Sequence, residues 1–283
     1  MTADSAKYVA ELVRAEDRDR YLTALFAPVS ARQDVMTLYA ANVEISKIRD
    51  AVSEPLIGQM KIEWWKNVIA AIYDGGDVPS GNPVVEELCR VIGARKLSRQ
   101  NFDALLDARA EDMAEEGPQD VLALEVYAEG TSSRLIQLSL EVLGVRDAET
   151  MTAARHVGVA WALAGIIRAV LFHARANKLT LPNDLMQKYD LSGQDPFRKK
   201  NTDKLASVVA DIAQVARQHL EKARSYNHKI DRRGLSPLLV GALADQYLKG
   251  CADRKYDVFD PRHALQRPSV LSLTWRAMRN RYW

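Results

Sequence analysis

The stretch HVGVAWALAGIIRAVLFHAR, residues 156–175, is apolar on nearly every side of a helix. A helix without a polar face lies among other helices or in a membrane. Arg168 interrupts the run and Arg155 and Arg175 flank it, which leaves no uncharged span of the roughly 18 apolar residues that a membrane requires. We therefore expect a helix over about 149–176 that is buried at the centre of a helical bundle.

The polar and the small residues of this helix bear on what it contacts. Arg168 and His173 lie on a buried helix, yet no carboxylate occurs between Gly165 and Asn183. Small side chains permit either close packing of neighbouring helices or room for a lipid-like ligand, and the sequence leaves both alternatives open. These small residues are Gly158, Ala160, Ala162, Ala164 and Gly165.

The rest of the chain is also helical in its pattern. Apolar residues recur with the helical period, and alternating runs of β-branched residues are hard to find. No segment resembles a linker between domains, so we expect one all-α domain over residues 1–283. Prolines and glycines divide it into helices at about 4–26, 30–50, 55–73, 83–93, 98–116, 119–143, 149–176, 202–229, 236–250 and 269–281.

Composition limits the class of protein. The chain has 283 residues, 47% of them apolar and 27% charged, which is typical of a globular protein. Its net charge of +2 gives no electrostatic indication of nucleic-acid binding. Cys89 and Cys251 are far apart in the sequence, and we expect reduced thiols. Residues 1–20 are rich in acids, which favours a first helix over a targeting peptide.

Four segments, in this order, resemble the squalene/phytoene synthase family. The resemblance implies the isoprenoid synthase fold, a helical bundle around a deep apolar cavity. Active members of the family join two prenyl diphosphates head to head. The segments are YLTALFAPVSARQDVMTLYAANVEISKIRD (21–50), IEWWKNVIAAIYDG (62–75), YAEGTSSRLIQLSLEVLG (127–144) and HVGVAWALAGIIRAVLFHARANKLTLPND (156–184).

The aspartates that the family uses are mostly absent. Active members hold Mg²⁺ ions between two aspartate clusters, because ionisation of a diphosphate needs metal against the leaving anion. The resemblance places the first cluster on Ser46, Lys47 and Asp50, and the second on Ala169 and His173. Asp50 alone keeps a carboxylate. We therefore expect no catalytic residues, no metal site and no cofactor, with Mg²⁺ relevant only if the chain is an active prenyltransferase.

Other positions of the family's diphosphate site keep polar residues. The resemblance places Tyr39, Asp112, Tyr127, Arg168, Lys178 and Asp184 there, the last within Leu181–Asp184. These residues could hold an anionic head group without metal, through charge-assisted hydrogen bonds. Alternatively, Arg168 and Lys178 form structural ion pairs with Asp50, Asp112 or Glu129. Trp65, Trp161 and Phe172 could fill the cavity.

The segments 127–144 and 156–184 most resemble a branch of the family that assists assembly of respiratory complex I in mitochondria and related bacteria. This implies a non-catalytic protein whose partner is a complex I subunit or another assembly factor, with an isoprenoid lipid as a further ligand. The location implied is the bacterial cytoplasm at the inner face of the membrane, or the mitochondrial matrix for a processed eukaryotic chain. The alternative is an active head-to-head prenyltransferase, and a lipid carrier is a third interpretation.

Two further groups contain residue types that bind metals. Asp103, Asp107 and Glu111 are spaced to share one helix face, which fits a metal site but more often a solvated face. The histidines show no paired ligand spacing, so no zinc site is expected; they are His156, His173, His219, His228 and His263.

The segment RPSVLSLTWRAMRNRYW, residues 267–283, combines arginines with large apolar side chains. This composition suits an anionic membrane surface or a partner protein, and it also suits packing of a last helix on the bundle. The sequence leaves these three alternatives open.

Overall fold

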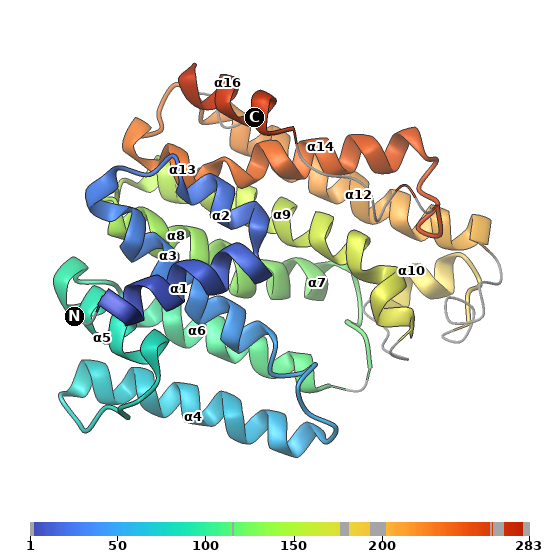
Figure 1. The fold of residues 1–283 in the computed structure, drawn as a ribbon. Helices are drawn as coiled ribbons and strands as arrows, with labels where there is room; N and C mark the ends of the chain where they lie inside the picture. Colours follow the sequence, from blue (N-terminus) through green and yellow to red (C-terminus); the bar gives the residue numbers. More distant parts are fainter. Residues whose placement is uncertain are drawn as a thin grey trace.

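The computed structural model describes residues 3–114, 116–175, 181–192, 202–260, 262 and 269–279. These residues form helices joined by short turns, with no β-strand among them (Figure 1). The α-helices are α1 (Ala3–Glu16), α2 (Arg18–Ala24), α3 (Val29–Ser46), α4 (Pro55–Asp74), α5 (Pro83–Arg95), α6 (Arg99–Ala110), α7 (Val121–Ala128), α8 (Arg134–Val142), α9 (Ala148–Arg175), α10 (Asn183–Lys188), α12 (Thr202–Ser225), α13 (Leu235–Leu238), α14 (Val240–Asp253) and α16 (Val270–Met278). Three tighter or wider helical turns are η1 (Glu111–Met113), η2 (Glu129–Ser133) and η3 (Arg232–Gly234).

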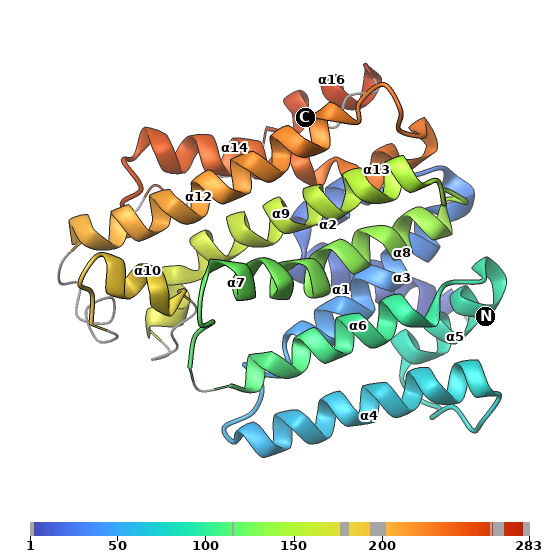
Figure 2. The same ribbon diagram turned by 180° about the vertical axis from the view of Figure 1, so that it is seen from behind.

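Helix α9 lies in the middle of the bundle, as its apolar sequence predicts. It packs against α7, η2, α8, α12 and α14, and both ribbon views show it between these elements (Figure 2). By length and composition, Ala148–His173 could cross a membrane, but half of its most apolar window is already buried by the rest of the protein. A buried core helix passes the same test, and the prediction of a central helix is confirmed.

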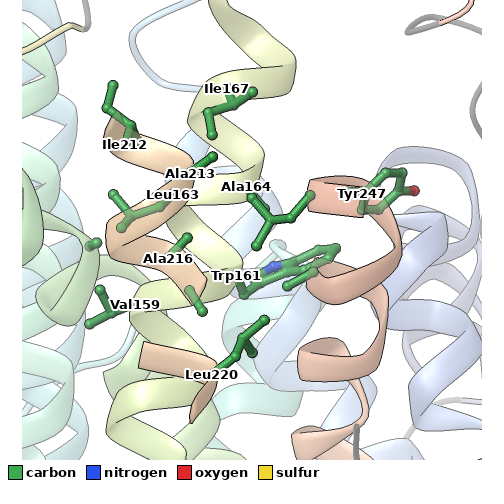
Figure 3. Close-up of a cluster of buried hydrophobic side chains, with 14 of the residues drawn as sticks. Val159, Trp161, Leu163, Ala164, Ile167, Ile212, Ala213, Ala216, Leu220 and Tyr247 are labelled. Carbon is green, nitrogen blue, oxygen red and sulfur yellow. The ribbon is translucent and has the colours of Figure 1, made fainter. Parts of the chain in front are cut away.

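Two hydrophobic clusters form the core. One surrounds α9, where Trp161 and Leu163 meet Ala216 of α12 and Tyr247 of α14 (Figure 3). The other joins α1, α3, α4, α5 and α6. Helix α8 contributes Ile136 to the first and residues on its other side to the second, so it separates the two clusters.

Three of the predicted helices divide or end earlier in the structure than the sequence pattern indicates. The Asp17 carboxylate accepts a hydrogen bond from the Arg20 backbone N–H at 3.1 Å, and this N-cap begins α2. The predicted helix 4–26 is therefore two helices. Helix α3 ends at Ser46, earlier than predicted, and the predicted helix 98–116 ends at Ala110 and continues as the short turn η1.

The predicted helix 119–143 is interrupted by η2, a turn of π-helix. Helices α6 and α9 both pack closely against η2, and each contact is made at a glycine, which has no side chain. A Cβ on Gly130 would lie 2.5 Å from the Ala108 Cβ of α6, and a Cβ on Gly158 of α9 would lie 2.4 Å from the Ser133 Cα. Gly158 therefore serves close packing, one of the two alternatives for the small residues. At Gly165 a Cβ would meet nothing within 4 Å.

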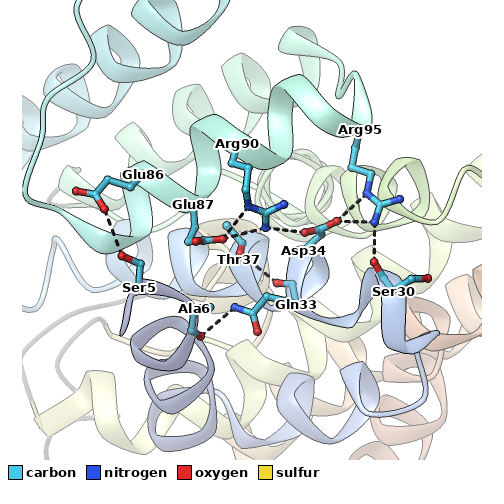
Figure 4. A network of polar contacts seen from close by, with 10 residues as sticks. All are labelled: Ser5, Ala6, Ser30, Gln33, Asp34, Thr37, Glu86, Glu87, Arg90 and Arg95. Carbon is cyan, nitrogen blue, oxygen red and sulfur yellow. Dashed lines mark hydrogen bonds and ion pairs between the residues drawn. The ribbon is translucent and has the colours of Figure 1, made fainter. Parts of the chain in front are cut away.

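A polar network fastens α3 to α5 (Figure 4). The buried Asp34 carboxylate accepts hydrogen bonds from Arg90 Nη2 and from Arg95 Nε, each at 2.7 Å. Arg90 also donates to Glu87 at 2.9 Å. Because each buried carboxylate is paired and hydrogen-bonded, the network fixes the relative position of the two helices without leaving an uncompensated charge.

Candidate functional site

A cavity of about 790 Å³ opens between the end of α3, the α6–η1 turn, residues 116–119, α7 and the C-terminal half of α9. Its described lining includes five of the predicted site residues, Ser46, Asp50, Asp112, Tyr127 and His173. The fold therefore brings together residues from four separate segments of the sequence. Trp65, Trp161 and Phe172, which were expected to be able to fill the cavity, are not among the described lining residues.

The first cluster position, at the end of α3, offers a single carboxylate. Ser46 directs its hydroxyl to the Val43 carbonyl at 3.2 Å, within its own helix. Lys47 is exposed, forms an ion pair with Glu16 of α1 and is not among the described lining residues. Asp50 is the remaining carboxylate at this position and lies exposed at the cavity.

The second cluster position, on α9, offers no carboxylate. Ala169 is half-buried and carries no donor atom, and His173 lines the cavity. Magnesium ions that bridge a diphosphate need several oxygen ligands from the protein. Among the described residues no group of three or more histidines, cysteines or carboxylates could hold a metal. The donor set at these two positions does not fit the multi-magnesium arrangement that the family resemblance implies.

Arg168 forms an arrangement that we name the inter-helix triad, Asp19–Arg168–Tyr247. Arg168 Nη1 lies 3.2 Å from Asp19 Oδ2, and the Tyr247 hydroxyl donates to the same oxygen at 2.8 Å. The Arg168 guanidinium also stacks on the Tyr247 ring, 3.7 Å from its centre. The carboxylate paired with Arg168 is thus Asp19 of α2 and not one of the suggested partners, whereas the ion pair suggested for Lys178 stays a prediction.

A second arrangement of the same composition, the cavity triad Arg109–Asp112–Tyr127, lies in the cavity wall. Arg109 Nη1 donates to Asp112 Oδ2 at 3.2 Å and to the Tyr127 hydroxyl at 3.1 Å. The Tyr127 hydroxyl donates to Asp112 Oδ1 at 2.5 Å. Burial raises the pKa of Tyr127, which keeps its proton in this bond. Asp112 and Tyr127 were predicted from the sequence, but Arg109 was missed, although it lies one helical turn before Asp112.

The other predicted positions lie apart from the lining or outside the described chain. Tyr39 is 1% exposed, and burial raises its pKa; the Arg20 guanidinium lies 5.9 Å from its ring centre. Asp184 is exposed at the start of α10, and its backbone N–H donates to the Gln119 carbonyl beside the cavity at 3.2 Å. Lys178 lies outside the described residues.

Sequence reasoning also missed a pair of histidines, of which His219 is buried and His156 half-buried. His156 Nδ1 of α9 lies 2.9 Å from His219 Nδ1 of α12, and His219 Nε2 lies 2.6 Å from Glu125 Oε1 of α7. Burial, with His219 beside it, lowers the pKa of His156 to about 4. No spacing rule finds this pair, because 63 positions separate its members. His263 lies outside the described residues.

The three acidic residues suggested as a metal site, Asp103, Asp107 and Glu111, do not act together. Asp103 lies 3.4 Å from Arg99, and Asp107 lies 2.6 Å from Lys66 of α4. Glu111 lines the cavity instead. Each of the two aspartates is thus compensated by a cation on the helix surface, which is the solvated-face interpretation.

This chain is similar in sequence to proteins of one family. The family model of squalene/phytoene synthase matches residues 13–273. A bovine protein (Bos taurus) named "NADH dehydrogenase (ubiquinone) complex I, assembly factor 6" is 33% identical over 279 residues, which cover 98% of this chain and 83% of that protein. A presqualene diphosphate synthase from Rhodopseudomonas palustris is 26% identical over 223 residues and covers 78% of each chain.

Among solved structures, a dehydrosqualene synthase crystallised with a ligand superposes with a TM-score of 0.82 at 17% identity. The match covers 98% of this chain and 96% of that structure. This likeness confirms the predicted fold, the all-α isoprenoid synthase fold. Together with the match over residues 13–273, it leads to one conclusion: the chain belongs to the squalene/phytoene synthase family.

Proposed function

We propose that this protein is a non-catalytic member of its family that assists the assembly of respiratory complex I. The observation that carries the proposal is the 33% identity, over 98% of the chain, to a relative named as a complex I assembly factor. The partner we propose is a complex I subunit or another assembly factor. The place of action is the inner face of the bacterial membrane, or the matrix side in a processed mitochondrial chain.

The chemistry of the cavity supports a role without catalysis. Its described lining carries four carboxylates against two arginines, Arg49 and Arg109. A diphosphate brings several negative charges into this acidic surrounding, and no described cluster supplies the metal that would offset them. Arg168, the cation best placed by the family resemblance, is already neutralised by Asp19.

Deletion of the gene in its own host tests the assembly role. We expect less assembled NADH-quinone oxidoreductase on native gels and lower NADH oxidation by isolated membranes. Wild type and Asp50→Ala should both restore the complex, because the role needs no carboxylate at the former metal position. Normal amounts of the complex in the deletion strain would contradict the proposal.

A second candidate is head-to-head prenyl transfer, which is favoured by the relative named presqualene diphosphate synthase and by the retained Asp50. Incubation of the purified protein with farnesyl diphosphate and Mg²⁺ tests it. A time-dependent prenyl product that disappears in Asp50→Ala would establish this activity. We expect no product above that of the heat-inactivated protein.

We also propose that the cavity binds an isoprenoid or another lipid as a stable ligand, because 790 Å³ of space remains in its interior. Solvent extraction of the native protein, followed by mass spectrometry, should find a lipid in near-stoichiometric amount. Ala123→Trp places a large ring in the lining and should abolish the lipid. A lipid retained equally by this variant would show that it binds elsewhere.

A further inference from the structure

Helix α16 presents large apolar side chains to solvent. Leu271 is 83% exposed, Trp275 51% and Met278 80%, and their spacing places them on one side of the helix. Val270 beside them is 45% exposed. Burying such residues is normally favourable by roughly 25 cal/mol for each Å² removed from water. A helix that leaves them all outside has an unpartnered face.

The opposite side of α16 anchors it firmly to the bundle. Leu273 is fully buried, and Ala277 packs on the same core cluster. The Ser269 hydroxyl caps the helix by accepting from the Ser272 N–H at 3.2 Å, and the Ser269 N–H donates to Gln246 of α14 at 3.0 Å. Both ribbon views place α16 at one outer edge of the molecule (Figures 1 and 2). The apolar face is therefore held outward on a fixed support.

Charge distinguishes this end of the chain from the rest. Residues 261–283 contain five arginines, no lysine and no acid, so the remaining 260 residues carry a net charge of −3. On α16 itself the Arg279 guanidinium stacks on the Trp275 ring, 4.1 Å from its centre, beside the apolar face. Helices that bind the surface of an anionic bilayer typically carry arginine and tryptophan beside an exposed apolar face.

We propose that α16 docks this protein onto the surface of an anionic phospholipid bilayer, with Leu271, Trp275 and Met278 entering the head-group boundary and Arg279 facing the phosphates. Charge complementarity identifies an anionic bilayer as the binding partner, because residues 261–283 are basic whereas the remaining residues carry a net negative charge. A flat bilayer also accepts a ridge at the outer edge of the molecule, whereas a protein partner would have to supply a matching groove. This inference goes beyond the assembly role and does not depend on it.

Helix α4 supplies a matched control surface. Leu56, Met60 and Trp64 are 64%, 65% and 40% exposed and also follow one helix face. Charges of both signs accompany them, among them Lys61 and Glu63. Both views place α4 at the edge opposite α16 (Figures 1 and 2). Equivalent apolar side chains are thus exposed at both edges, and an excess of arginines accompanies those of α16.

Co-sedimentation of the full chain with vesicles tests the proposal. One set of vesicles contains phosphatidylcholine alone, and the other contains phosphatidylcholine with about one third phosphatidylglycerol. We expect binding to the anionic vesicles to exceed binding to the neutral ones by roughly tenfold or more and to fall steeply with added salt. Leu271→Asp with Met278→Asp should reduce the binding about tenfold, and Arg279→Glu should reduce it several-fold.

Leu56→Asp with Met60→Asp is the control and should leave vesicle binding unchanged. Thermal unfolding of each variant verifies that it is folded, since every changed side chain is exposed. Equal binding to neutral and anionic vesicles, or equal losses from the α4 and α16 variants, would overturn the proposal. Vesicle binding that is unchanged in the α16 variants would also overturn it. So would a wild-type protein that does not bind vesicles but whose α16 cross-links to an acidic protein.

Discussion

The cavity triad and the inter-helix triad are built from the same three residue types but differ in what they join. Arg109, Asp112 and Tyr127 lie within 18 positions of sequence, and the Arg109 side chain is 16% exposed. The inter-helix triad joins α2, α9 and α14, and its Arg168 side chain is 38% exposed. The comparison indicates that the cavity triad fixes the wall of a pocket, whereas the inter-helix triad neutralises Arg168, which the family resemblance places at the diphosphate site.

Removing the acid of the cavity triad should have the largest effect. Asp112→Ala leaves a mostly buried guanidinium, whose Nε already has no hydrogen-bond partner among the described residues, without its carboxylate. We expect a loss of roughly 3–5 kcal/mol in the free energy of unfolding, measured by urea titration. Asp103→Ala on the preceding helix α6 removes an exposed pair and should cost less than about 1 kcal/mol. Equal losses in both variants would remove the distinction between buried and exposed pairs.

Removing the acid of the inter-helix triad should cost less stability and expose a charge. Asp19→Asn weakens one ion pair and one hydrogen bond from Tyr247, so we expect a loss of roughly 1–2 kcal/mol. The released Arg168 should then bind pyrophosphate more tightly, as calorimetry would measure. The double variant with Arg168→Gln should lose this gain. Unchanged pyrophosphate affinity in Asp19→Asn would show that Asp19 does not neutralise this site.

The histidine pair at the other end of α9 should make stability depend on pH, and neither triad contains a histidine. The pKa of His156 is lowered from 6.5 to about 4 in the folded chain, so the unfolded chain binds the proton more readily. Its contribution is complete above pH 6.5 and is lost as the pH falls toward 4. The unfolding temperature of wild type should therefore fall across this range more than that of His156→Gln. Parallel curves would contradict the assignment.

The smallest effect is expected at Lys47, which directly follows α3. Lys47 and Glu16 are exposed, with side chains 50% and 40% accessible. Lys47→Ala should change the free energy of unfolding by less than about 0.5 kcal/mol, because exposed ion pairs contribute little. A chemical-denaturation curve that overlays wild type would support this expectation. A large loss would mean that Lys47 stabilises the fold to an extent comparable with the cavity triad.

The sequence predicted elements that depend on local pattern. Helix α9 was predicted to be central because its apolar residues leave no polar face. Ser46, Asp112 and Tyr127, which the family resemblance assigns to the diphosphate site, line the cavity, and their role in binding a ligand stays a prediction. The division at Asp17 was missed, because an aspartate inside a helical pattern reads as a surface residue until its capping bond to the Arg20 N–H is known.

Contacts between distant segments could not be predicted in the same way. Arg168 and Asp19 are 149 positions apart, and His156 and His219 are 63 apart. Such pairs depend on which helices become neighbours, and the pattern of a single sequence does not show that. The π-turn η2 was missed for a different reason, since the residues Glu129–Ser133 follow a helical pattern whose extra width is set by packing against α6 and α9.

The π-turn has a consequence for the evolution of the cavity wall. A π-turn amounts to one residue inserted into an α-helix. Deleting a single residue from Glu129–Ser133 would restore an ordinary helix and rotate α7 by about 100° relative to α8. Tyr127 would then swing out of the wall, and a different side of α7 would face the pocket. The identity of the pocket surface thus depends on chain length at one turn as much as on the residues that line it.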